Sequence, residues 1–301
     1  DLFTYPPPSS PKSSITSAFT GSRTVSASFF GMHIQNQANL PTAQSLIAFN
    51  AVRSHDSGGS GGMRWYTLNP SNGVFNWTNS DAWINAMYAA GKEVIFLLGF
   101  TPNWAAVATP GTGKYDNGTT VTGSNQMTSN IAYWDAFCSA VATRYLGKIK
   151  YYEIWNEVNY SSYWAGTAAN LAQLTRRANQ VIKAIDPTAK IVAPIVQEPE
   201  TGGTGNAYLQ SFLSASDGAT GTGKDWLDVC GIHMYPPKYN YQVHKNQIDN
   251  VQASLTAAGA GPVEIWNTET GVLQGASIID QVQSKWLRRS LSLSAAVAVS
   301  R

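Results

Sequence analysis

Two stretches of the sequence share one design, an apolar run that ends in a glutamate. The first is Tyr-Tyr-Glu-Ile-Trp-Asn-Glu-Val-Asn at residues 151–159, with a carboxylate at Glu157. The second is Val-Glu-Ile-Trp-Asn-Thr-Glu-Thr-Gly at residues 263–271, with a carboxylate at Glu269. Two carboxyl groups that face one substrate can act as a general acid and as a nucleophile or base, which is the chemistry that cleaves a glycosidic bond.

Length and charge limit what the chain can be. Its 301 residues suffice for one large barrel or two ordinary domains. Charged residues make up 13% of the chain, against roughly 25% in typical soluble domains. The net charge is +2 and no basic cluster is present, so we expect no nucleic-acid partner. No apolar run reaches the about 18 residues that cross a bilayer, so we expect no membrane partner either.

The beginning of the chain favours a secreted protein, either extracellular or periplasmic. Residues 1–28 are rich in Pro, Ser and Thr, which predicts an extended lead rather than a packed element. The sequence opens at Asp1 rather than Met, which suggests processing. Cys138 and Cys230 lie outside any CxxC motif, and we favour two buried free thiols over a disulfide between them. We predict neither a cofactor nor a bound metal.

After residue 28, strand patterns alternate with helical ones. Strands are predicted at residues 29–34, 51–56, 93–100, 150–155, 190–195, 226–235 and 262–268. Helices are predicted at residues 41–49, 81–90, 131–145, 170–185, 208–215, 247–258 and 277–299, with Ser80 as the cap of the second. This alternation indicates an α/β fold with a parallel sheet, and we predict a (β/α)8 TIM barrel over residues 29–301.

Polar residues recur where the predicted strands end, the face on which such a barrel carries its active site. They are His33, Arg53, His55, Trp104, Asn156, Glu157, His233, Tyr235 and Glu269. An open doubly wound sheet would also place ligands there, but residues 31–34 form no Gly-rich phosphate turn.

Three of these residues are histidines, which leaves a metal-dependent barrel hydrolase as an alternative, although the chain lacks both HxH and HExxH. His244 is predicted to lie in a loop. A carbohydrate-binding barrel without catalysis is a further alternative, against which the retention of both glutamates argues.

The strand endings Trp155-Asn156-Glu157 and Thr268-Glu269-Thr270-Gly271 resemble those of clan A glycoside hydrolases. Within that clan the chain is most similar to family 39. The similarity rests on the Arg53-x-x-Asp56 ending, the Trp65-x-x-Leu-Asn-Pro…Gly73-Val-Phe-Asn-Trp77 connection and Thr101-Pro102-x-Trp104. It extends over residues 29–301.

The resemblance implies a retaining two-carboxylate mechanism on a polysaccharide or oligosaccharide. Glu157 would be the acid/base and Glu269 the nucleophile. Glu157 would need a raised pKa, to which the negative charge of Glu269 would contribute. Arg53 would lie beside the nucleophile and help to keep it ionised.

Five further binding residues follow from the resemblance and from the strand ends. Asn156 would bind the sugar 2-hydroxyl, and His233 and Tyr235 would lie at the floor of the site. We also assign His33 to substrate binding. In the loop after the strand predicted at residues 93–100, we expect Trp104 to be a platform on which a sugar ring stacks.

Three other residues have less settled roles. Asp56 is either a partner of Arg53 or a substrate contact. Trp164 belongs either to the core or to the sugar site. Glu153 is interpreted as a structural residue, paired inside the barrel or facing the helices.

The sequence departs from the family at its end. Only seven strands are predicted, and residues 295–301 stop where the resemblance places an eighth. An open barrel would expose two sheet edges. We therefore hypothesise that a separate C-terminal fragment supplies the eighth strand.

Overall fold

The computed structural model describes residues 27–46, 48–58, 62–107, 112–114, 120–199, 202–235 and 241–270. Within these ranges one sheet of seven strands has the order β1-β2-β3-β6-β7-β8-β9, and every neighbouring pair is parallel. The strands are β1 (Gly31–His33), β2 (Ala51–Arg53), β3 (Glu93–Leu98), β6 (Ile149–Ile154), β7 (Lys190–Gln197), β8 (Val229–Met234) and β9 (Glu264–Thr270).

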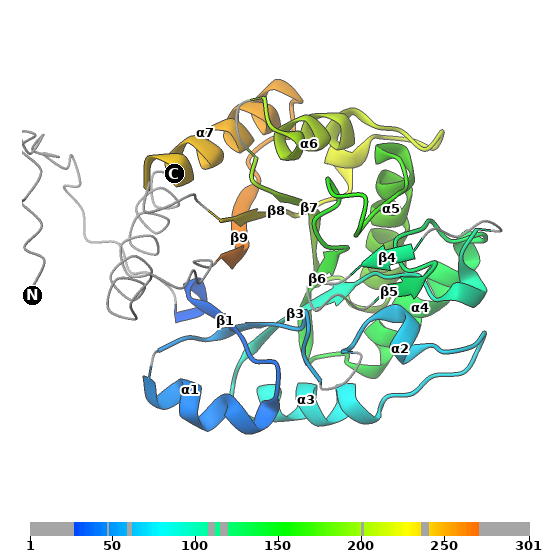
Figure 1. The fold of residues 1–301 in the computed structure, drawn as a ribbon, viewed down its shortest axis with the longest axis vertical. Helices are drawn as coiled ribbons and strands as arrows, with labels where there is room; N and C mark the ends of the chain where they lie inside the picture. The colour runs from blue at the N-terminus through cyan, green and yellow to red at the C-terminus, as the bar shows by residue number, and fades with distance from the viewer. Residues whose placement is uncertain are drawn as a thin grey trace, which may run out of the picture.

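Each strand of this sheet pairs with the strand of the same sheet that follows it along the chain. Because the pairs are parallel, every connection must return across the sheet, and helices make these returns. Figure 1 shows the strands around the centre and the helices on the outside. This is the predicted TIM barrel, nearly closed, with seven of its eight strands among the described residues.

The predicted helices lie where the sequence indicated, as far as the structure describes them. They are α1 (Leu40–Leu46), α3 (Thr78–Ala89), α4 (Ile131–Arg144), α5 (Ala168–Ile185), α6 (Thr204–Ser214) and α7 (Tyr241–Ala257). The sequence did not predict the short helix α2 (Trp65–Leu68) or the hairpin of β4 (Thr112–Lys114) and β5 (Thr120–Thr122). The predicted helix at 277–299 and residues 1–26 of the lead lie outside the described residues.

Two local predictions were wrong. Helix α3 begins at Thr78 with Trp77 at its N-cap, and the hydroxyl of Ser80 instead donates to the carbonyl of Trp77 at 3.0 Å. His244 lies buried in α7 rather than in a loop. In both cases the helix begins earlier than the residue pattern suggested.

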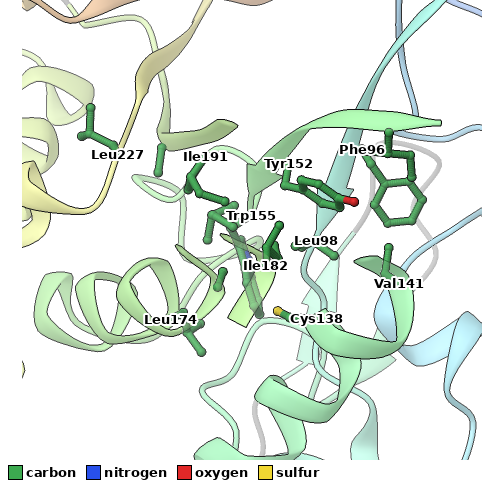
Figure 2. Close-up of a cluster of buried hydrophobic side chains, with 14 of the residues drawn as sticks. Phe96, Leu98, Cys138, Val141, Tyr152, Trp155, Leu174, Ile182, Ile191 and Leu227 are labelled. Atoms are coloured by element: carbon green, nitrogen blue, oxygen red, sulfur yellow. The ribbon is translucent and has the colours of Figure 1, made fainter. Parts of the chain in front are cut away.

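The main core fills the layer between the sheet and the helices. Figure 2 shows Leu98 of β3 and Tyr152 of β6 packed with Cys138 and Val141 of α4 and with Ile182 of α5. These side chains alternate along each strand with residues that face the barrel interior. The strands therefore read as continuous apolar runs, because both of their faces are covered.

Both cysteines are buried and free, as predicted. Burial raises the pKa of the Cys230 thiol to about 12 and that of Cys138 well above its ordinary value. Because the thiolate is the reactive form, these two side chains behave as small apolar residues of the core.

The first and last described strands differ from the others in burial. All residues of β2 and β8 are buried, whereas those of β1 and β9 are mostly half-buried. Figure 1 places β1 and β9 on the same side of the barrel. A ring nitrogen of His33 lies 3.3 Å from the carbonyl oxygen of Thr268, so the two strands approach each other at the end that carries the polar residues.

None of the helices in the described part of the chain combines the length and the apolar character that crossing a membrane requires.

Candidate active site

Strand β6 and the turn after it position Glu157. Glu153 faces the barrel interior, and Tyr152 and Ile154 face the helices. The backbone then turns sharply, because Trp155 and Glu157 have φ of 65° and 43°. Left-handed backbone at a residue other than glycine costs about 1–3 kcal/mol and persists only where its surroundings enforce it.

The Trp155 ring is what holds this turn. The backbone N–H of Trp155 donates to the carbonyl of Leu98 at 2.8 Å, and its indole N–H donates to the carbonyl of Tyr163 at 2.7 Å. Trp164 packs edge-to-face on the ring at 4.5 Å between centroids, so it belongs to the core rather than to a sugar site. The strained turn therefore rests on packed aromatic side chains, and it carries Glu157 to the barrel mouth.

A bulge between β8 and β9 positions Glu269. Ile232 pairs with Asn267, but His233 pairs with Glu269, so Thr268 is an extra residue on β9. A bulge re-aims the side chains that follow it. Here it brings Glu269 beside His233 and turns the Thr268 hydroxyl onto Glu153, where it donates at 2.6 Å to Oε1.

Glu269 accepts hydrogen bonds on both carboxylate oxygens. Nη1 of Arg53 donates to Oε2 at 2.6 Å, and the Tyr235 hydroxyl donates to Oε1. Burial by itself would raise the pKa of Glu269, but His233 and Arg53 outweigh it and hold that pKa well below the ordinary value. Because a neutral imidazole contributes no charge, Arg53 is the permanent source of this effect at neutral pH.

Arg53 connects three strands of the site, β2, β6 and β9. Its guanidinium donates to Oε2 of Glu153 at 2.5 Å, to Glu269 at 2.6 Å and to Oδ1 of Asn156 at 2.8 Å. A guanidinium presents its N–H groups in a rigid planar arrangement, so it holds these three acceptors in fixed positions relative to one another. Burial disfavours the charged guanidinium, but the carboxylates of Glu153 and Glu269 keep the pKa of Arg53 above its ordinary value.

Glu153 has a larger part in the site than the sequence indicated. As expected, it is paired inside the barrel, and it is fully buried. Burial raises its pKa, and the bonds from Arg53 and Thr268 oppose that change. The signal in the sequence was its spacing, because Glu153 shares the inward-facing side of β6 and lies four residues before Glu157.

His233 lies between the two candidate catalytic carboxylates. Its Nδ1 is 2.9 Å from Oε1 of Glu157 and 3.9 Å from Oε2 of Glu269. Burial and the positive charge of Arg53 lower the pKa of His233 well below its ordinary value. The imidazole is therefore neutral at neutral pH, and its ring links Glu157 to Glu269 without adding charge.

His55 also lies near Glu269, and His33 lies beside His55. Nδ1 of His55 is 3.9 Å from Oε2 of Glu269, and the two imidazole rings lie 6.4 Å apart. Burial and Arg53 lower the pKa of His33 to about 4 and that of His55 well below its ordinary value. Asp56 pairs with Arg64, whereas Arg53 donates to Glu153, Glu269 and Asn156.

The carboxylates of Glu157 and Glu269 meet at the centre of this arrangement. One oxygen of each, together with a nitrogen of His233, forms a group whose atoms all lie within 4.8 Å of one another. The alternative metal set His33, His55 and His233 is not the one that the described residues bring together; the three-ligand group contains both carboxylates instead.

The contacts that the structure shows for Trp104 lie outside this group. Its indole N–H donates to the carbonyl of Asn69 at 2.8 Å, and its ring packs edge-to-face on Tyr133 of α4. Its role as a sugar platform stays a prediction.

Comparison with solved structures agrees with this fold. A GH39 beta-xylosidase from Caulobacter crescentus has a TM-score of 0.60 at 19% identity, over 87% of this chain and 58% of that one. A GH39 enzyme from Xanthomonas axonopodis pv. citri has a TM-score of 0.58 at 20% identity, over 80% and 50%. A glucosidase from Croceicoccus marinus has a TM-score of 0.58 at 15% identity, over 80% and 50%. The chain thus spans about half the length of these proteins.

The comparison with family models is more specific than these structural similarities. Residues 16–259 match the model described as glycosyl hydrolases family 39. The matched range covers most of the chain and includes strands β1 to β8 and Glu157. The chain belongs to glycosyl hydrolases family 39.

Proposed function

We propose that the protein hydrolyses glycosidic bonds with retention of configuration, with Glu157 as acid/base and Glu269 as nucleophile. The observation that carries this proposal is the approach of their carboxylate oxygens to within 4.8 Å. Retaining enzymes hold the two carboxyl groups about 5–5.5 Å apart, whereas inverting enzymes leave room for a water between them.

In the first step, a carboxylate oxygen of Glu269 attacks the anomeric carbon while Glu157 gives its proton to the departing glycosidic oxygen. The bond from that carbon to the leaving group breaks, and a covalent glycosyl-enzyme forms. In the second step, Glu157 accepts a proton from water, and the oxygen of that water displaces Glu269. Two inversions at one carbon give net retention.

The neighbouring residues support these roles. Arg53 and Tyr235 bind the two oxygens of Glu269, which keeps the nucleophile ionised and oriented. Oδ1 of Asn156 accepts from Arg53, so the NH2 group of Asn156 is directed to donate to a sugar hydroxyl. His233 contacts Glu157 and orients the acid.

For the substrate, we propose an oligosaccharide or polysaccharide with a β-type or a xylosyl- or arabinosyl-like linkage. Similar structures carry the names beta-xylosidase, glucosidase and xylanase, which supports this proposal. We also propose that the protein is secreted, which its low charge and Pro/Ser/Thr-rich beginning favour.

A separate C-terminal fragment that supplies an eighth strand is a further proposal. The half-buried strands β1 and β9 support it, since each pairs on one side only among the described residues. Mass spectrometry of the native protein tests it. A second polypeptide that copurifies with this chain is expected, and its absence from an active sample would contradict the proposal.

The catalytic proposal is tested with a panel of aryl glycosides. The first product is expected to keep the substrate's anomeric configuration, which NMR detects before mutarotation. Activity should persist in EDTA and vanish in Glu269→Ala. An inverted first product would refute the nucleophilic role of Glu269, and loss of activity in EDTA would point to a metal-dependent hydrolase.

A further inference from the structure

Two neighbouring residues of β9, Thr268 and Glu269, both direct their side chains into the barrel. The Thr268 hydroxyl donates to Oε1 of Glu153 at 2.6 Å, and Glu269 accepts from Nη1 of Arg53 at 2.6 Å. In a regular strand, successive side chains point to opposite faces, so two neighbours could not share the interior. The bulge at Thr268 removes this restriction. The direction of the Glu269 side chain therefore depends on the conformation of one extra residue.

Side chains from two other strands bind this extra residue. Because a bulged residue has no opposite partner in the ladder, the pairing of β8 with β9 does not itself fix Thr268. Its hydroxyl binds Glu153 of β6, and its carbonyl oxygen lies 3.3 Å from Nε2 of His33 on β1. A carbonyl oxygen only accepts, so we place the proton of this neutral imidazole on Nε2. Thr268 is thus anchored by β1 and by β6.

The contacts of Thr268 close a ring that contains the candidate nucleophile. From the Thr268 hydroxyl, the ring passes through the carboxylate of Glu153 to Nε of Arg53, which donates to Oε2 at 2.5 Å. It continues from Nη1 of Arg53 to Oε2 of Glu269, and the peptide bond between Thr268 and Glu269 completes it. Both the backbone and the side chain of Glu269 are therefore tied to the same buried ion pair.

We propose that Thr268 is a positioning residue for nucleophilic attack, because its hydroxyl, held by Glu153, fixes the bulge that aims Glu269 at the anomeric carbon. The hydroxyl acts through Glu269 and takes no part in making or breaking a bond. Attack requires the reacting atoms to be about 3–3.5 Å apart and aligned, so a displaced carboxylate slows the reaction more than it weakens binding. The inference rests on the proposed function and deepens it.

Thr268→Val tests this role, since valine keeps the shape of threonine and lacks the hydroxyl. The probe is a dinitrophenyl 2-deoxy-2-fluoro-β-xyloside, or the corresponding glucoside if the aryl glycoside panel favours glucose. Glu269 attacks its anomeric carbon, dinitrophenolate leaves without a proton from Glu157, and the fluorine slows hydrolysis of the glycosyl-enzyme. Mass spectrometry follows the labelling of Glu269 over time. We expect the maximal labelling rate to fall about ten- to a hundredfold, with little change in the half-saturating probe concentration.

The same strand provides a matched control. Thr270 follows Glu269 directly, and its hydroxyl donates to the carbonyl of Met234 at 2.6 Å, outside the ring. Thr270→Val should therefore be labelled at close to the wild-type rate, and Thr268→Ser should restore labelling because it restores the hydroxyl. Thermal unfolding shows whether each variant is folded. If Thr268→Val does not fold, Thr268→Ala takes its place, because it brings no methyl group against Glu153.

The remaining outcomes separate this inference from the catalytic proposal. If the wild-type protein is labelled at Glu269 and folded Thr268→Val is labelled as fast as Thr270→Val, the positioning role is refuted while retaining hydrolysis stands. An equal loss in both valine variants also refutes it, since general damage to β9 then explains the effect. If the wild-type protein is labelled at a residue other than Glu269, the nucleophile is wrongly assigned and the inference fails with it.

Discussion

Nε of Arg53 lies 2.5 Å from Oε2 of Glu153, and both side chains are buried inside the barrel. Glu153 thereby fixes the guanidinium that binds the candidate nucleophile. Because Thr268 also donates to Glu153, the pair joins β2, β6 and β9. The barrel therefore uses one interior carboxylate to hold the strands that carry its active site.

Replacing Glu153 by alanine should lower the free energy of unfolding by about 3–5 kcal/mol, because it removes one partner of a buried ion pair. Urea denaturation followed by circular dichroism measures this loss. Asp249→Asn is the control, since the Lys245–Asp249 pair on α7 is exposed and contributes about 0.5 kcal/mol or less. Equal effects of the two substitutions would contradict the central position of Glu153.

Arg53→Gln should move the acidic limb of the kcat/KM profile to higher pH. Arg53 holds the pKa of Glu269 below its ordinary value, so losing the guanidinium raises that pKa. The nucleophile must be ionised, and the variant therefore loses activity first at low pH, with a shift of about 1–3 units. Arg144→Gln, at the surface pair with Asp81, should leave the profile unchanged.

If Arg53→Gln does not fold, Tyr235→Phe gives the same test more mildly, because it removes one hydrogen bond to the ionised carboxylate. An acidic limb that stays in place in a folded Arg53→Gln variant would show that the ionisation of Glu269 does not depend on the guanidinium.

Glu157→Gln should slow hydrolysis about 10²–10⁴-fold on substrates with poor leaving groups, since general acid catalysis contributes about that factor. On aryl glycosides with good leaving groups, the formation of the glycosyl-enzyme needs no proton and should be affected far less. Values of kcat/KM across a series of leaving groups measure the difference, because kcat/KM reports formation of the glycosyl-enzyme and not the second step, in which Glu157 acts as base. A uniform loss over the whole series would argue against Glu157 as the acid.

Gly99→Ala should damage both stability and catalysis. A Cβ at this position would lie 3.2 Å from the Cα and from ring atoms of Trp155, where the backbone is left-handed. Overpacking of this kind costs about 1–3 kcal/mol, and a displaced Trp155 also displaces Glu157. Thermal unfolding and kcat/KM measure the two effects. Gly91→Ala is the steric control, because its Cβ would meet nothing within 4 Å, although its positive φ carries a cost of its own.

The sequence by itself determined the barrel and its candidate catalytic glutamates. Apolar runs that alternate with amphipathic segments are local patterns, and so are the polar endings at Glu157 and Glu269. Parallel strands bring their carboxyl ends to one face, which is why strand-end residues could be assigned to a common site. The free thiols of Cys138 and Cys230 were predicted for the same reason, since both lie in apolar stretches.

Tertiary structure decided how the site is connected. Arg53 lies 100 residues from Glu153 and 216 from Glu269, so no local pattern could specify which carboxylates it binds. The bulge that places Glu269 beside His233 depends on the register between β8 and β9. Asp56 forms an ion pair with Arg64, and Trp104 donates to the carbonyl of Asn69; both contacts exist only after the loops pack. Such contacts are set by barrel closure, because strand register fixes which distant side chains face one another.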